Sequence, residues 1–516
     1  MDSQAEAMPR VTAASRYEML TTDRSPFLDR AERASELTIP FLFQERTTQI
    51  REDYQSLGAR CVNNLAAKLL LALFPPGAPF FKLAVDDFIL ESLQGGENED
   101  PTAEIEAALS KIERSVTKRL EGAGYRSPVS NLLKHLLVAG NGLLEILPNG
   151  KIKFRSLRSY VVKRDLDGNL IEVVTKDELA KSALPPKLQQ IAEDNPEKMD
   201  KGEDGKSIAL FTHAKLDGSK WSVYQELGGS EVPYSRSSYP KDRLKFLALR
   251  FTAVEGEDYG RGYVEEFRGD LASYDSLQES MVGFAAVAAK ILFFVDESGF
   301  TSRREIQNAR NGEILEGSAK DVTTLQLEKM QDFQVANAVA QDIKMRLEQA
   351  FLMASSAQRD AERVTAEEIR LIAGELEQTL GGLYSVLAQE LQLPLVTLTM
   401  AQLQRERKLP RLPDDTVSPQ IVTGLEGLGR NSELQRLQAL MGNLSALGPE
   451  AVTEYLKVGA YIQRVSAALS IESDGMIRTE SEVQQAREKA RQQALAEKAI
   501  GPSISASAQP SAPVAG

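Results

Sequence analysis

Apolar residues recur every three or four positions through four segments in the first part of the chain, which is the spacing of one helix face. These segments are Tyr17–Leu42, Tyr54–Phe74, Ile105–Leu120 and Val129–Gly140. The second has the clearest stripe, made of Leu57, Cys61, Leu65, Lys68, Leu69 and Leu73. Phe74-Pro75-Pro76-Gly77 follows that stripe and is a strong helix breaker. We therefore predict four helices in this part of the chain.

Short runs rich in β-branched and aromatic residues come next, separated by turn residues. The runs are Leu143–Leu147, Lys151–Phe154, Tyr160–Arg164, Leu170–Val174, Ile208–Ala214, Trp221–Leu227 and Leu244–Phe251. Two of the separating turns, Pro148-Asn149-Gly150 and Asp167-Gly168-Asn169, have the residues of β-hairpins. The pattern predicts a mixed α+β body from Tyr17 to Phe267, in a chain that is predominantly α.

Helical spacing returns in two segments that bracket an insert. Leu271–Ile291 is the first, and its small residues allow close approach to neighbouring helices: Gly283, Ala285, Ala286, Ala288 and Ala289. Phe333–Met353 is the second, with an apolar stripe at Val335, Val339, Ile343, Leu347 and Phe351. Asp296–Met330 lies between them, and we expect it to be irregular.

A long amphipathic helix is predicted after these two. Thr365-Ala366-Glu367-Glu368 has the form of a capping box at its start. We expect Gly381-Gly382 to bend this helix and Pro394 to end it. Its apolar face consists of Ile369, Ile372, Leu376, Leu380, Leu383, Leu387 and Leu391. The preceding loop, Ser355–Arg363, has mixed charges and no large apolar residue, so we expect it to be mobile. The two helices and this loop, from Phe333 to Val396, suggest a structural device rather than an enzyme. The alternative interpretation of that segment is an ordinary helical hairpin on a globular surface.

The chain from Thr416 onward is helical in pattern again, with Gly-rich joints. Thr479–Ala499 is rich in Gln, Ala, Glu, Lys and Arg, which is typical of a solvated helix. Gly501–Gly516 is a Ser/Ala/Pro segment of low complexity, for which we predict disorder.

Composition narrows the class of protein. The 61 basic and 74 acidic residues leave a net charge of −13, which argues against a protein that holds nucleic acid by overall positive charge. Cys61 is the only cysteine, so an intrachain disulfide and a cysteine metal cluster are excluded. The first residues lack a signal-peptide pattern, and the longest apolar run, Met281–Val295, contains Lys290. We expect a soluble protein that is not secreted.

Motifs for catalysis are weak or incomplete. His135 and His213 are the only histidines and lie in different segments, so we expect structural roles for both rather than a triad or a metal site. Gly205-Lys206-Ser207 and Asp165–Asn169 lack essential positions of a phosphate-binding loop and a calcium loop, respectively. Gly260-Arg261-Gly262 lacks the third glycine of a dinucleotide fingerprint. We expect no enzyme activity, no cofactor and no metal.

Several dispersed stretches are more specific. They are Thr38-Ile39-Pro40, Asn63-Asn64-Leu65-Ala66, Ala72-Leu73-Phe74-Pro75, Val138-Ala139-Gly140-Asn141, Ser159-Tyr160-Val161-Val162, Tyr259-Gly260-Arg261, Glu362–Arg370 and Gln389–Val396. Through them the chain resembles the portal, or head-to-tail connector, of short-tailed podovirus phages of the autographivirus type. The resemblance covers nearly the whole chain and weakens after Arg430.

The resemblance implies a portal fold that assembles as a dodecameric ring at one capsid vertex, around a channel for double-stranded DNA. It divides the chain into a wing, two stem helices, a clip, a channel loop and a crown. The expected boundaries are 1–267 for the wing, 268–295 and 333–354 for the stem helices, 296–332 for the clip, 355–364 for the channel loop, 365–415 for a long wing helix and its return, 416–500 for the crown and 501–516 for a disordered tail.

The same resemblance implies passage of the genome during packaging and ejection, in a virion assembled in the bacterial cytoplasm. The implied partners are other copies of the chain, double-stranded DNA, the terminase large subunit, the major capsid and scaffolding proteins and a tail adaptor protein, with no membrane involved. The alternative function is a helical scaffold or assembly protein that does not bind DNA, and a hydrolase is a third interpretation.

Basic residues near the insert and the loop are the candidate site residues. For contact with DNA we select Gln358, Arg359 and Arg363 in the loop, and Lys344 and Arg346 in the second stem helix. For contact of the clip with partner proteins we select Arg303, Arg304 and Arg310. Ordinary solvation of a charged surface is the alternative explanation for these residues.

Overall fold

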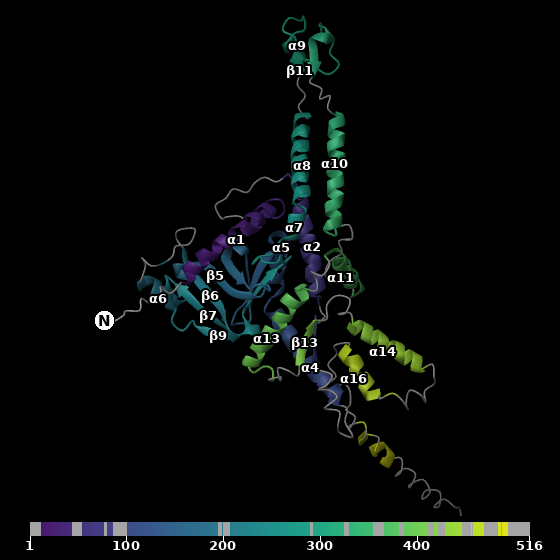
Figure 1. Cartoon of the computed structure of the whole chain (residues 1–516). Coiled ribbons are helices and arrows are strands. Elements are labelled where there is room, and N and C mark those ends of the chain that lie inside the picture. Colours follow the sequence, from purple (N-terminus) through teal and green to yellow (C-terminus); the bar gives the residue numbers. More distant parts are fainter. Residues whose placement is uncertain are drawn as a thin grey trace, which may run out of the picture. The chain divides into compact units, whose positions relative to one another are not determined.

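Figure 1 shows the computed structural model of the chain. The structure describes residues 12–43, 54–76, 80–85, 101–194, 199, 207–288, 293–324, 330–353, 366–380, 386–410, 417–421, 429–445, 456, 458–468, 483, 485–486 and 488–493. The chain divides into two compact units, Met1–Phe80 with Val116–Pro410 and Phe81–Ser115 with Arg411–Gly516. None of the helices in the described ranges is long and apolar enough to cross a membrane.

The predicted helices of the first part are confirmed, with shifted ends. They are α1 (Ala13–Glu36), α2 (Leu57–Leu73), α4 (Pro101–Gly122) and α5 (Arg126–Ala139). Helix α1 begins four residues before its predicted start because Thr12 caps it, with the Thr12 hydroxyl accepting from the Ser15 amide. It also ends earlier, and a separate 3₁₀ helix, η1 (Pro40–Leu42), follows.

All seven predicted strands are present and form two antiparallel sheets. A three-stranded sheet has the order β10-β2-β3, with bounds Phe246–Arg250, Asn141–Ile146 and Ile152–Arg155. A six-stranded sheet has the order β4-β5-β6-β7-β8, and β9 also pairs with β7. Its strands are β4 (Tyr160–Arg164), β5 (Leu170–Ala180), β6 (Ser207–Asp217), β7 (Lys220–Leu227), β8 (Ser230–Glu231) and β9 (Ser237–Pro240). Gly150 and Gly168 turn the two predicted hairpins at positive φ, 83° and 81°.

The core of this unit lies where helices cover the sheets. Helix α1 packs on the six-stranded sheet through a buried cluster of Ala13, Tyr17, Leu20, Val161, Val174, Ala209 and Phe211. Helix α5 contacts α1, α2, β2 and β3, and its Val129, Leu132 and Leu133 are fully buried. Helix α6 (Pro186–Asp194), which the sequence pattern did not indicate, packs through Leu188 and Ala192 against Leu210 and Leu227.

Helices α8 (Arg268–Ala288) and α10 (Met330–Ala350) run beside each other, as Figure 1 shows. We call them the helix pair. The insert between them contains a few short elements, and its other described residues are irregular, as predicted. Strand β11 (Phe293–Val295) pairs with β12 (Val322–Thr324), and α9 (Arg303–Asn308) and η6 (Ala319–Asp321) lie between them in the chain. These elements are too short to show a hydrophobic period.

The predicted long helix is described in separate parts, α11 (Ala366–Leu380) and a later stretch that begins at Val386. Gly381-Gly382 and the capping residue Thr365 lie outside the described residues. The prediction that Pro394 ends the helix is wrong, because α13 (Leu393–Arg405) runs through it. The π-helix η8 (Ala388–Gln392) precedes it directly, and Pro394 lies in the first turn of α13, where a missing amide hydrogen costs little.

The second unit contains a strand pair between distant segments. Strand β1 (Phe81–Val85) pairs antiparallel with β13 (Val417–Ile421), and the Leu83 amide donates to the buried Glu113 carboxylate at 2.8 Å. Helices α14 (Gly429–Ser445) and α16 (Val458–Ala468) contact each other. The described residues of the predicted Thr479–Ala499 helix are helical, and the predicted disordered tail, 501–516, lies outside the described residues.

Candidate functional site

The helix pair is joined to the sheet-containing body by an aromatic cluster at its base. Helix α7 (Tyr263–Glu266) leads into α8, and the Tyr263 hydroxyl donates to the Ala350 carbonyl at 2.9 Å. The Phe351 ring is fully buried, with its centroid 5.2 Å from that of Tyr263 and 5.4 Å from that of Phe267. Burial and hydrogen bonding therefore hold the base of the pair.

Helix α10 ends in a Schellman motif, which normally has glycine at its left-handed position. The Met353 amide donates to the Glu348 carbonyl at 2.8 Å, and the Leu352 amide donates to the Gln349 carbonyl at 3.1 Å. Leu352 occupies the left-handed position with φ 54°. A branched side chain costs on the order of 1 kcal/mol there, so surrounding contacts must stabilise this turn.

The face between the two helices is apolar. Ala340, Ile343 and Leu347 of α10 are buried, and the rings of Phe284 and Phe333 stack with centroids 5.1 Å apart. This agrees with the predicted stripe at Ile343, Leu347 and Phe351. The stripe residues Val335 and Val339 are different, because both are exposed.

A second set of apolar side chains on the helix pair is exposed in the single chain. The exposed fractions are 51% for Val282, 46% for Val287, 64% for Val335, 46% for Val339 and 57% for Met345. We call these residues the outer apolar set. Gly283, Ala285 and Ala286 are also exposed and leave the α8 backbone accessible to close packing. Each of these apolar side chains loses water contact wherever another surface covers it.

The predicted basic residues of α10 are paired with acidic side chains. Arg346 Nη2 lies 3.1 Å from Asp270 Oδ1 on α8, and its Nε lies 3.8 Å from Asp342 Oδ2. Lys344 Nζ lies 3.9 Å from Glu348 Oε1. These pairs offset the positive charge that was expected to contact phosphate.

The predicted clip residues lie on an accessible surface, and the predicted loop residues cannot be placed. Arg303 and Arg304 are exposed at the start of α9, and Arg310 is exposed in the turn after it. Gln358, Arg359 and Arg363 lie outside the described residues.

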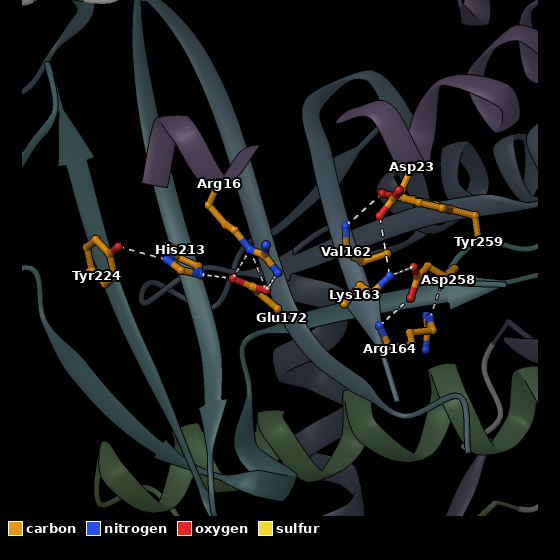
Figure 2. Close-up of polar contacts among 10 residues, drawn as sticks. All are labelled: Arg16, Asp23, Val162, Lys163, Arg164, Glu172, His213, Tyr224, Asp258 and Tyr259. Atoms are coloured by element: carbon orange, nitrogen blue, oxygen red, sulfur yellow. Dashed lines mark hydrogen bonds and ion pairs between the residues drawn. The ribbon is translucent and has the colours of Figure 1, made fainter. Parts of the chain in front are cut away.

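His213 belongs to a polar network that crosses three strands (Figure 2). Its Nε2 lies 2.8 Å from Glu172 Oε1, and its Nδ1 lies 3.0 Å from the Tyr224 hydroxyl. Arg16 of α1 donates to the same Glu172 carboxylate from Nε and Nη2. Burial acts to raise the pKa of Glu172, but the hydrogen bonds from His213 and Arg16 outweigh it and lower that pKa to about 2.

This network joins α1 to the sheet and does not form a nucleophile. Burial, followed by the charge of Glu226, raises the pKa of the Tyr224 phenol, so the hydroxyl stays protonated near neutral pH. His135, in contrast, is enclosed by the rings of Phe43 and Phe154, and burial lowers its pKa to about 4. The two histidines thus lie in different surroundings, His213 among polar partners and His135 between aromatic rings. In the described part of the chain, no three His, Cys, Asp or Glu side chains are grouped to hold a metal ion.

Two of the specific sequence stretches meet at the start of β2. Asn141 Nδ2 donates to the Gly260 carbonyl at 2.8 Å, and the Gly260 amide donates back to Asn141 Oδ1 at 2.8 Å. Gly140 has φ 71°, and a Cβ at this position would collide with the Arg261 backbone. The pattern Val138-Ala139-Gly140-Asn141 therefore serves a close backbone contact with Tyr259-Gly260-Arg261.

A second group of contacts in Figure 2 fixes the same loop to β4. The Tyr259 hydroxyl accepts from the Val162 amide at 3.0 Å, and Asp258 accepts from the Arg164 amide at 2.7 Å and from Lys163 Nζ at 2.8 Å. The loop that leads into α7 and α8 is thus held by strand β4.

Comparison with known proteins gives consistent matches over most of the chain. The family model described as "Bacteriophage head to tail connecting protein" matches residues 10–477. The portal protein of Enterobacteria phage T3 is 38% identical over 495 residues, which cover 94% of this chain and 91% of that protein. The portal protein of Escherichia phage T7 is 39% identical over 484 residues, which cover 92% of this chain and 89% of that protein.

A weaker likeness is found among solved structures. A chain from the neck of an empty GTA particle is 13% identical, with a TM-score of 0.38, and the match covers 75% of this chain and 86% of that chain. This likeness is too low to say more about the present chain.

Proposed function

The chain belongs to the bacteriophage head to tail connecting protein family, and we propose that copies of it close into a dodecameric ring around a channel for double-stranded DNA. Its role is that of a portal in the phage virion, at the connection between head and tail. The ring, the channel and the partners named below are our proposal for how it performs this role.

The outer apolar set on the helix pair is the observation that carries the proposal. Exposed valines such as Val335 lose solvent contact when another copy covers them, which stabilises the assembly. A ring requires two different faces of one subunit to meet in turn. The small residues of α8, including Gly283 and Ala286, allow a neighbouring helix to approach closely.

We assign the regions of the chain to the parts of such a ring. The helix pair forms the stem, from 268–295 and 333–354, and the insert 296–332 forms the clip. Residues 1–267 form the wing, with 365–415 as its later helical part, and 416–500 form the crown. The clip presents Arg303, Arg304 and Arg310 to the terminase large subunit and later to a tail adaptor protein, while the major capsid and scaffolding proteins meet the outer surface.

Charge supports a channel that lets DNA slide. The net charge of −13 per chain makes the assembled ring anionic, and at physiological salt its repulsion of phosphate acts over about 8 Å. Because Lys344 and Arg346 are paired with acidic side chains, we assign DNA contact chiefly to the loop residues Gln358, Arg359 and Arg363. The energy for translocation comes from a separate ATPase, and the chain itself performs no bond chemistry.

The test is the state of the purified full-length chain. Mass photometry and negative-stain microscopy should find closed rings with a central channel. A monomer, or an open filament, would contradict the proposal, and so would ATP turnover by the purified chain alone.

A further inference from the structure

We propose that Lys68 of α2 is a positioning residue whose ammonium group holds the end of α10 and helix α11 together. We call its contacts with Leu352 and Glu375 the lock. The lock fixes the helix pair to the body at the point where α10 stops. The proposal concerns contacts within one chain and holds whatever the number of copies in the assembly. Any effect of these contacts on the passage of DNA, in contrast, rests on the proposed function.

Lys68 is a buried cation in an otherwise apolar stripe. It lies on α2 among Leu65, Leu69 and Leu73, and only 7% of its surface is exposed. A buried ammonium is costly unless hydrogen bonds and opposite charge replace its water. The sequence pattern placed this residue on the apolar face without giving a reason for its charge.

The ammonium group contacts two elements that are remote in sequence. Lys68 Nζ donates to the Leu352 carbonyl at 2.7 Å and to Glu375 Oε2 of α11 at 3.2 Å. Leu352 is the second residue after the end of α10, whereas Glu375 lies in the middle of α11. One charged group therefore takes part of its solvation from each element, so displacement of either one weakens the binding of the other.

The neighbouring residues on α2 contact the same turn. Asn64 Nδ2 donates to the Phe351 carbonyl at 3.0 Å and to the Leu352 carbonyl at 3.2 Å. Cys61 Sγ lies 3.6 Å from Met353 Sδ. Positions 61, 64 and 68 are spaced by three and four, so they share one helix face. This face of α2 meets residues 351–353 one after another.

These contacts explain how leucine is kept in a left-handed conformation. Carbonyl groups at a helix C-terminus lack intrahelical donors and carry partial negative charge. The Asn64 amide and the Lys68 ammonium supply donors and positive charge at Leu352, whose φ is 54°. The position at which α10 stops is therefore set by α2, rather than by a glycine in the α10 sequence.

Hydrogen–deuterium exchange of the full-length chain tests the lock. Lys68→Met retains the apolar stem but removes the charge and the donors. We expect amide exchange to rise about tenfold both at Phe351–Met353 and in α11, since hydrogen bonds to a charged group are lost in both places. Lys68→Arg, which retains the charge, should give a smaller rise.

Glu375→Gln keeps the test decisive if Lys68→Met does not fold, because the Glu375 side chain is 34% exposed. A lock predicts that this change in α11 also raises exchange at Phe351–Met353. Asp270→Asn is the matched control, since it makes the same chemical change in an exposed pair with Arg346 on the helix pair. It should leave exchange at Phe351–Met353 unchanged.

Two results would overturn the proposal, because each would show that the two elements are independent. One is a rise in amide exchange that is confined to α11 in Glu375→Gln. The other is a rise in amide exchange that is confined to Phe351–Met353 in Lys68→Met. The functional consequence is measured separately, as DNA packaged by phage that carry Glu375→Gln. If the wild-type chain forms no ring, the proposed function fails, while the exchange result still decides whether the lock exists.

Discussion

Arg155 Nη2 lies 2.6 Å from Glu145 Oε2, and the two side chains extend from the adjacent strands β3 and β2. The same guanidinium also lies 2.6 Å from Asp177 Oδ2 on β5, so it connects the three-stranded sheet to the six-stranded sheet. Burial acts to raise the pKa of Glu145, but Arg155 and Lys245 outweigh it and hold that pKa below its usual value. This contact between the sheets is therefore ionic and largely buried.

Arg155→Met should destabilise the chain strongly, because it leaves two carboxylates without their shared cation. We expect the free energy of unfolding to fall by about 3–5 kcal/mol, measured by chemical denaturation. Lys153→Met removes a more exposed cation from the same Asp177 and should cost less than about 1 kcal/mol. Equal losses in the two variants would contradict the structural role of Arg155.

Glu172 should make stability depend on pH in the acid range. Its folded-state pKa is about 2 and its ordinary value is 4.5, so the stabilisation is present above pH 4.5 and is lost as the pH falls from 4.5 to about 2. Glu172→Gln should flatten this part of the curve of unfolding free energy against pH. If unfolding free energy changes with pH equally in the wild type and in Glu172→Gln, the contacts of Glu172 with Arg16 and His213 do not control that change.

His135 should make the stability of the fold depend on pH in a higher range than Glu172 does. Burial lowers its pKa from 6.5 to about 4, so between these values the unfolded chain binds a proton that the folded chain excludes. Stability should therefore decrease as the pH falls from 6.5 to 4, by at most about 1.4 kcal/mol per pH unit. His135→Leu should remove this slope. A variant that keeps the slope would show that another group causes it.

Val335→Asp should prevent assembly without unfolding the chain. The Val335 side chain is 64% exposed in the single chain, so the carboxylate is solvated in a monomer and desolvated at an interface between copies. Mass photometry should detect monomers where the wild type forms rings. Leu166→Asp is the matched control, since Leu166 is 94% exposed at a hairpin turn far from the helix pair in sequence; rings in both variants would exclude Val335 from the interface.

Replacing Arg359 and Arg363 together with Ala should reduce packaged DNA while rings still form. The physical reason is the loss of two cations from the loop that we assign to phosphate contact. Packaged DNA is measured in phage that carry the double variant. Arg346→Ala should have a smaller effect, because Asp270 and Asp342 already offset the charge of Arg346. Unchanged packaging in the double variant would remove the loop from the mechanism.

Local order along the chain was predictable because it depends on neighbours in sequence. The α2 stripe from Leu57 to Leu73, the hairpins at Gly150 and Gly168 and the two members of the helix pair all follow from spacing and turn chemistry. That His135 and His213 have structural roles stays a prediction, made because the two lie in different segments. Among the candidate site residues, spacing suggested Arg346 but gave no indication that Asp270, on another helix, would pair with it.

Contacts between remote segments could not be read from spacing. Examples are the pairing of Phe81–Val85 with Val417–Ile421, the Asn141–Gly260 contact and the burial of Lys68. Each depends on which surfaces meet after folding, and many remote residues have the right chemistry to be the partner. Leu352 shows the same limit, since residue preference argued against its left-handed conformation and the surrounding chain outweighed that preference. Periodicity and turn residues are enough to define helices and strands, whereas partners are chosen by three-dimensional complementarity of shape and charge.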